Sequence, residues 1–62
     1  MPSFAQILEV KRRVEKALTM LAGREASLAE IAIDCGFADQ SHFTKVFRRV
    51  ARVTPRDYRL VA

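Results

Sequence analysis

Apolar residues recur at spacings of three and four along most of this chain, and this spacing constrains its fold more than any other feature. In the first third of the chain the repeat comprises Phe4, Ile7, Leu8, Val14, Ala17, Leu18 and Leu21. Such spacing places apolar side chains on one face of an α-helix, whereas the side chains of a strand alternate every second residue. Because no segment alternates in the manner of a strand, the sequence predicts an all-α fold.

Capping signals divide the chain into four predicted helices. Each helix is preceded by a side chain that can accept a hydrogen bond from a backbone amide of the first turn, and these side chains are Ser3, Ser27, Asp39 and Thr54. The predicted helices span residues 4–22, 28–35, 39–51 and 55–61. Gly23 and Gly36 follow the first two helices, where a left-handed cap is expected.

The second and third helices are expected to complete the core. Their apolar faces comprise Leu28, Ile31, Ala32 and Cys35 in the second helix and Phe43, Val46, Phe47 and Val50 in the third. Phe37, in the turn between them, can fill the wedge where the two helices meet. The aromatic residues of the C-terminal half could instead form a base-stacking platform for single strands, but their helical spacing favours the core.

The single cysteine, Cys35, and the single histidine, His42, limit the chemistry open to the chain. They cannot form an internal disulfide or complete a tetrahedral zinc site. Ser41 and His42 are adjacent on a helix, so their side chains diverge, and no carboxylate accompanies them to orient the imidazole. We therefore expect no catalytic residue, no metal and no cofactor, and interpret Cys35 as a small buried hydrophobe. A lone thiol fits a reducing compartment, which indicates the cytoplasm.

Positive charge is concentrated at the C-terminal end of the chain. The net charge is +4, but residues 1–39 contain five basic and six acidic side chains, whereas residues 40–62 contain six basic side chains and Asp57 as their one acid. A basic cluster of this kind favours a nucleic acid or an anionic membrane surface as partner. A solvated basic face is the alternative interpretation. No apolar run approaches the roughly 20 residues that cross a bilayer.

The segment between residues 28 and 51 has the pattern of a helix-turn-helix. Two helices separated by a short turn that contains glycine are typical of this motif, whose second helix enters the major groove of DNA. At 100° per residue, the face opposite the apolar stripe presents short polar side chains first and long cations later. From their chemistry we expect base contacts from Gln40, Thr44 and Lys45. We expect phosphate contacts from Arg48, Arg49, Arg52 and Arg56.

The same segment resembles the signature of AraC/XylS-type bacterial transcription regulators. The matching residues are Ile31-Ala32, Cys35-Gly36-Phe37, Asp39 to Phe43, Val46 to Arg49, Val53-Thr54-Pro55 and Tyr58-Arg59. Residues 13–21 resemble the linker helix of that family. The resemblance implies a homeodomain-like fold of linker helix, helix-turn-helix and short C-terminal helix. It further implies that five residues face the bases: Gln40, Ser41, His42, Thr44 and Lys45. It also implies double-stranded DNA, and RNA polymerase, as partners.

Members of the family are implied to have two helix-turn-helix motifs, and the first is absent from this sequence. We therefore expect Met1-Pro2-Ser3 to be an internal junction of a longer regulator, with a natural mini-protein as the alternative. Without the first motif, the apolar stripe of helix 4–22 would be partly uncovered, and this stripe comprises Phe4, Ile7, Leu8, Val14 and Leu18. An uncovered stripe favours a protein-interaction or homodimerisation fragment as the alternative function. Binding to a membrane surface ranks last, because the C-terminal helix is short and weakly amphipathic.

Overall fold

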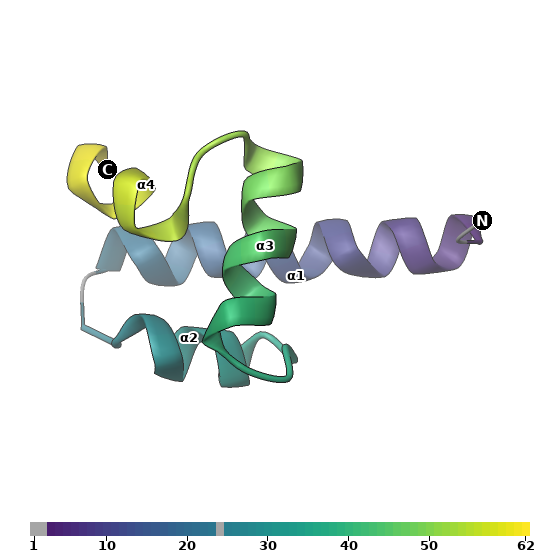
Figure 1. Ribbon diagram of the computed structural model, residues 1–62, viewed down its shortest axis with the longest axis horizontal. Coiled ribbons are helices and arrows are strands. Elements are labelled where there is room, and N and C mark those ends of the chain that lie inside the picture. The colour runs from purple at the N-terminus through teal and green to yellow at the C-terminus, as the bar shows by residue number, and fades with distance from the viewer. Residues whose placement is uncertain (1–2, 24) are drawn as a thin grey trace.

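The computed structural model describes residues 3–23 and 25–62, and within these ranges the chain forms four α-helices (Figure 1). The helices are α1 (Phe4–Gly23), α2 (Leu28–Asp34), α3 (Gln40–Ala51) and α4 (Pro55–Val61). The predicted all-α fold is therefore confirmed, with helix ends within one residue of those expected. Met1 and Pro2 of the expected junction, and Arg24 of the charge pattern, lie outside the described residues.

All four predicted helix starts are capped as expected. The side chains of Ser3 and Ser27 each accept a hydrogen bond from the backbone amide three residues later, and the backbone amides of the two serines donate to the side chains of Gln6 and Glu30, at distances between 2.9 and 3.3 Å. The Asp39 carboxylate accepts a 2.8 Å hydrogen bond from the amide of His42. The Thr54 hydroxyl accepts one from the amide of Asp57 at 3.1 Å. These caps satisfy backbone donors that a helix leaves free at its N-terminus.

Aromatic rings run in a continuous series through the centre of the molecule. Phe37 contacts Phe43, Phe43 contacts Phe47, and Phe47 contacts Tyr58, with ring centroids 5.1, 5.6 and 6.1 Å apart. Phe43 and Phe47 are fully buried among Val14, Ala17, Leu21, Ile31 and Ala32. The series joins the turn after α2 to α3 and then to α4. The aromatic residues are therefore core residues, as their spacing predicted, and are not a base-stacking platform.

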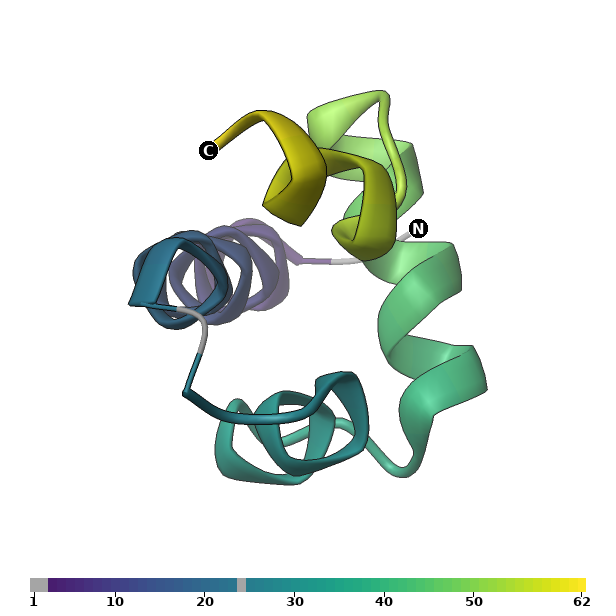
Figure 2. The same ribbon diagram turned by 90° about the vertical axis from the view of Figure 1, so that its left-hand side faces the viewer.

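The long helix α1 lies along one side of the molecule, and the other three helices pack against its C-terminal half (Figure 1). Viewed along α1, α2, α3 and α4 surround a common interior that the core side chains fill, with α3 on the side opposite α1 (Figure 2). The N-terminal half of α1 extends beyond them. None of the described helices is long and apolar enough to cross a membrane.

Four predicted core residues are exposed. Phe4, Ile7 and Leu8 at the start of α1 are 76%, 52% and 37% exposed, and Val50 at the end of α3 is 44% exposed. The reason is geometric: α2, α3 and α4 cover α1 only from about Val14 onward, so the apolar repeat continues past the surface that they bury. The alternative expectation of an uncovered stripe was wrong for Val14, which is 3% exposed, and for Leu18, which packs against the core.

The two glycines behave differently. Gly36 has φ +88°, the left-handed conformation predicted for it. Gly23 does not have a positive φ, because α1 continues one residue further than predicted and includes it. At Gly36 a Cβ atom would lie 3.4 Å from Nε of Arg13, whereas at Gly23 it would meet nothing within 4 Å. Glycine is therefore required by conformation at the first position and not at the second.

We expect Gly36→Ala to lower the free energy of unfolding by about 1–2 kcal/mol, because a Cβ atom disfavours the left-handed conformation. Gly23→Ala is the matched control and should raise it by about 0.5–1 kcal/mol, since alanine is the better helix former. Urea unfolding followed by circular dichroism measures both changes. Equal effects of the two substitutions would contradict the conclusion that the backbone conformation requires glycine at Gly36 but not at Gly23.

Candidate nucleic-acid interface

The turn between α2 and α3 sets the direction of the third helix. The amides of Cys35, Gly36 and Phe37 donate hydrogen bonds to carbonyls of α2 at 2.9–3.1 Å. These bonds end α2 and reverse the chain at Gly36. Phe37 is buried between the helices, as predicted. Five residues separate α2 from α3. The buried ring of Phe37 in this turn holds the relative orientation of the two helices.

His42 connects the first turn of α3 to this loop. Its Nδ1 atom accepts a hydrogen bond from the amide of Ala38 at 3.4 Å, and its ring meets Phe37 edge to face at 5.5 Å. A ring nitrogen that accepts a hydrogen bond bears no proton, so the neutral ring has its proton on Nε2. His42 is otherwise exposed. It therefore presents a donor to the solvent side while it braces the turn.

The other predicted base-facing residues lie together at the N-terminal end of α3. Gln40, Ser41, Thr44 and Lys45 line one shallow hollow on the outside of the helix. Three of these side chains are exposed, and Thr44 is half-buried. Because the buried stripe of α3 faces α1 and α2, this hollow faces away from the body of the protein. The structure thus brings the polar residues to one surface, as the helical spacing predicted.

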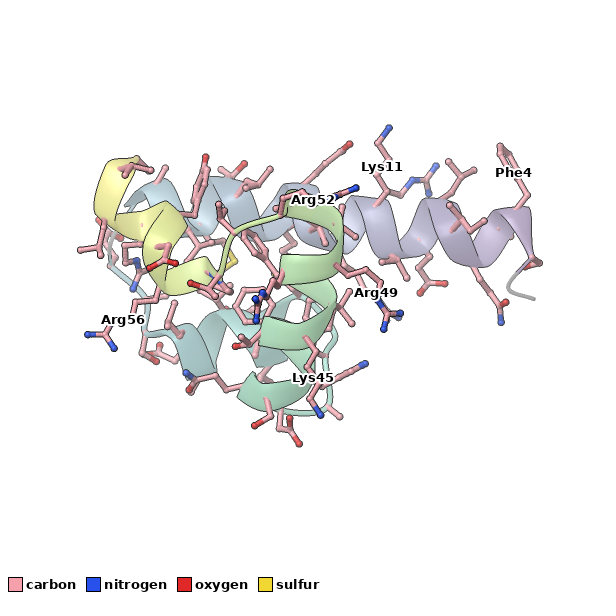
Figure 3. All side chains as sticks on the ribbon, turned by 45° about the horizontal axis from the view of Figure 1, so that its top comes forward. Phe4, Lys11, Lys45, Arg49, Arg52 and Arg56 are labelled. Carbon is pink, nitrogen blue, oxygen red and sulfur yellow. The ribbon has the colours of Figure 1, made fainter. Side chains whose placement is uncertain are left out.

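The predicted phosphate-binding residues are only partly brought together. Lys45, Arg48, Arg49 and Arg52 line a second hollow that shares Lys45 with the first. Figure 3 shows Lys45, Arg49 and Arg52 at successive levels along α3, while Arg56 extends on the other side of α3, from α4. Across residues 3–23 and 25–62 the one ion pair joins Arg13 to Glu9, at 2.7 Å. The four cations of the second hollow therefore have no carboxylate partner among the described residues.

Two cationic side chains have structural roles that the sequence pattern did not indicate. The Arg59 guanidinium donates hydrogen bonds to the carbonyls of Leu21 and Ala26, at 3.3 and 2.6 Å, and so ties α4 to the end of α1. Lys16 donates to the carbonyl of Asp34, at the end of α2, at 3.1 Å. These partners are 18 to 38 residues apart in sequence. No local spacing rule relates residues so distant, and only the resemblance singled out Arg59.

The environment of Cys35 supports its interpretation as a core residue. Burial raises the pKa of the thiol and is the main cause, while nearby Lys16 lowers it and Asp34 raises it. The Sγ atom lies 3.9 Å from Sδ of Met20, inside the core. A raised pKa keeps the sulfur as an unreactive thiol at neutral pH. In the described part of the chain no group of three His, Cys, Asp or Glu side chains is placed to hold a metal ion.

The fold and this surface together define a helix-turn-helix module with an outward-facing second helix. The comparison with known proteins agrees: the family described as helix-turn-helix domain matches residues 3–60, and the chain belongs to this family, in its AraC/XylS type. No solved structure matches the chain.

Relatives of known function are named as transcriptional activators. The chain is 47% identical over 47 residues to the HTH-type transcriptional activator RhaS of Escherichia coli O157:H7. The same identity over the same length relates it to the HTH-type transcriptional activator RhaR of Yersinia pseudotuberculosis serotype O:1b (strain IP 31758). Each alignment covers 76% of this chain but only 17% of RhaS and 16% of RhaR. The chain thus spans less than a fifth of the length of these relatives.

We expect the neutral side chain of His42 to have its proton on Nε2, because Nδ1 accepts the hydrogen bond from Ala38. Long-range proton–nitrogen NMR correlations of the ring, at a pH at which it is neutral, distinguish the two tautomers. His42→Asn, whose amide oxygen can replace Nδ1, should retain about 1 kcal/mol more of the free energy of unfolding than His42→Leu. A proton found on Nδ1 would contradict the bracing role.

Proposed function

We propose that this module binds double-stranded DNA sequence-specifically by inserting α3 into the major groove. The observation that carries the proposal is the arrangement on the outer face of α3, where polar side chains precede cations that have no ion-pair partner among the described residues. An α-helix fits the major groove, and in helix-turn-helix proteins the N-terminal residues of the second helix meet the base edges. The family membership of the chain supports the same function.

Base contacts are proposed for Gln40, Ser41, His42, Thr44 and Lys45. A glutamine can pair with N6 and N7 of adenine, a lysine with O6 and N7 of guanine, and a threonine methyl can contact the methyl of thymine. A histidine with its proton on Nε2 offers a donor and would select an acceptor, such as O4 of thymine or O6 of guanine. The first hollow gathers four of these residues, which supports a common role.

Phosphate contacts are proposed for Arg48, Arg49, Arg52 and Arg56. Contacts of this kind fix the register of the helix on the duplex without reading its sequence. The first three arginines share a hollow with Lys45. Arg56 lies on the other side of α3 (Figure 3). Cations on both sides of a helix that enters a groove are suited to reach the two backbones that border the groove.

In the whole protein we propose that this module is one of two DNA-binding motifs of a transcription regulator. Two recognition helices on one face of the duplex would then lie one helical turn apart, roughly 34 Å. The relatives are named as activators, and contact with RNA polymerase is accordingly proposed for the whole protein. The regulator would act in the cytoplasm, on the nucleoid, where bacterial chromosomal DNA lies. No catalytic role is proposed.

Titration with a short mixed-sequence duplex at low salt tests the binding mode. We expect changes in the backbone amide NMR shifts of residues 39–49, reversed by added salt. Four phosphate contacts predict that log affinity falls with log salt concentration with a slope of about 3–4. Arg48→Gln should lower that slope by about 0.9, the effect of one lost contact.

Arg12→Gln is the matched control, because Arg12 is an exposed arginine of α1 outside the hollows on α3. It should leave the slope nearly unchanged. If the duplex instead shifts the amides of residues 4–22, or if both variants lower the slope equally, groove insertion by α3 is wrong and the binding is a diffuse attraction of charge.

A second candidate function is self-association through the N-terminal half of α1. The specific observation is the apolar surface formed by Phe4, Ile7 and Leu8, with Val50 of α3 also exposed. Contiguous exposed apolar residues of this kind mark protein-interaction surfaces. A homodimer formed through this surface would present two copies of α3 to DNA, so that this function is compatible with the first.

We expect the mean molecular mass from sedimentation equilibrium to rise with protein concentration if α1 self-associates. Ile7→Glu should abolish the rise, because a carboxylate in an apolar interface loses its hydration without gaining a partner. Ile33→Glu is the control, since Ile33 is 61% exposed but lies on α2. A constant monomer mass over the whole concentration range would rule out the dimer.

A further inference from the structure

Arg52 is the one residue other than glycine with a positive φ within residues 3–23 and 25–62. It caps the C-terminus of α3 with φ 69° and ψ 6°, and its amide donates a 2.9 Å hydrogen bond to the carbonyl of Arg48. This left-handed cap is the position at which helices most often have glycine. The chain itself has glycine at its other left-handed position, Gly36.

The conformation is unfavourable for an arginine. The Cβ atom of an L-residue in the left-handed region approaches the following carbonyl oxygen too closely, and glycine alone avoids this contact at no cost. A residue held in such a conformation is a reason to look for a function of its side chain. The question is therefore what the Arg52 side chain contributes that glycine would not.

Interactions within the protein do not explain the arginine. Its side chain is exposed, and the ion pair found between two described residues, Arg13 and Glu9, does not involve it. It shares a hollow with Lys45, Arg48 and Arg49. Four like charges in one hollow repel one another, so that the arrangement is unfavourable until a polyanion occupies it.

We propose that Arg52 is an affinity-determining phosphate contact for which the chain gives up stability at the end of α3. This inference rests on the proposed DNA binding by α3, in which Arg52 is one of the phosphate contacts, and adds that stability is exchanged for affinity at this residue. The left-handed residue ends the helix, and its cation extends the basic surface of α3 beyond the last helical turn. Glycine at this position would relieve the strain but would remove one of the four cations from the hollow.

The test is Arg52→Gly, measured for thermal unfolding and for binding to a mixed-sequence duplex two helical turns long. We expect opposite changes in the two properties. The melting temperature should rise by about 4–8 °C, because in a domain of this size even a small gain in stability raises the melting temperature by several degrees. Affinity should fall by up to about eightfold at 0.1 M salt, and the salt slope by about 0.9, the contribution of one phosphate contact.

Arg52→Lys is the matched variant, since it keeps both the charge and the Cβ atom. It should leave the melting temperature and the salt slope nearly unchanged. If the Arg52→Gly variant binds the duplex with unchanged affinity and unchanged salt slope, the proposal is overturned while DNA binding by α3 remains intact. If the melting temperature of the Arg52→Gly variant does not rise, Arg52 does not lower the stability of the domain and the proposed exchange of stability for affinity is wrong. Absence of duplex binding by the unsubstituted chain would defeat this inference and the proposed function together, whatever the melting temperature does.

Discussion

Phe43 and Phe47 lie fully buried where α3 packs against α1 and α2, and their packing fixes the position of everything on the outer face of α3. A buried aromatic side chain contributes about 2–3 kcal/mol through removal of apolar surface from water. In a domain of 62 residues, where the core is small, two such residues are a large share of the driving force. Because both lie on one stripe of α3, burial of that stripe leaves the opposite stripe exposed.

The exposed stripe can therefore change its chemistry without disturbing the core. Gln40, Ser41 and Lys45 are all exposed, and none of them contributes to the aromatic series. His42 is the exception, because it is both exposed and bonded to the turn through Ala38. Arg52 is a second exception of another kind, since its backbone conformation costs stability at the end of the same helix. The proposed recognition of DNA is thus separable from stability over most of α3, and the two are proposed to be coupled at its two ends.

Hydrogen bonds between residues distant in sequence join the helices to one another outside the small apolar core. Arg59 reaches back to the carbonyls of Leu21 and Ala26, and Lys16 reaches the carbonyl of Asp34. Both cations satisfy carbonyl groups at or beyond helix C-termini, which otherwise lack partners. In contrast, the first turns of α1 extend beyond the other three helices (Figure 1), and their apolar side chains remain exposed.

The sequence by itself determined the helices and the turn, because caps, helical periodicity and the glycine at Gly36 act between residues only a few positions apart. It also indicated the outer face of α3, since Phe43 and Phe47 identify the buried stripe and hence the opposite one. Only the tertiary structure decided how far the core extends. Periodicity states which residues of α1 share a face but not where a neighbouring helix ends, and so Phe4 and Ile7 followed the pattern yet remained exposed. The role of Arg59 and the conformation of Arg52 were likewise decided in three dimensions, because the first depends on carbonyls 33 and 38 residues away and the second is a backbone angle that neither charge nor spacing reveals.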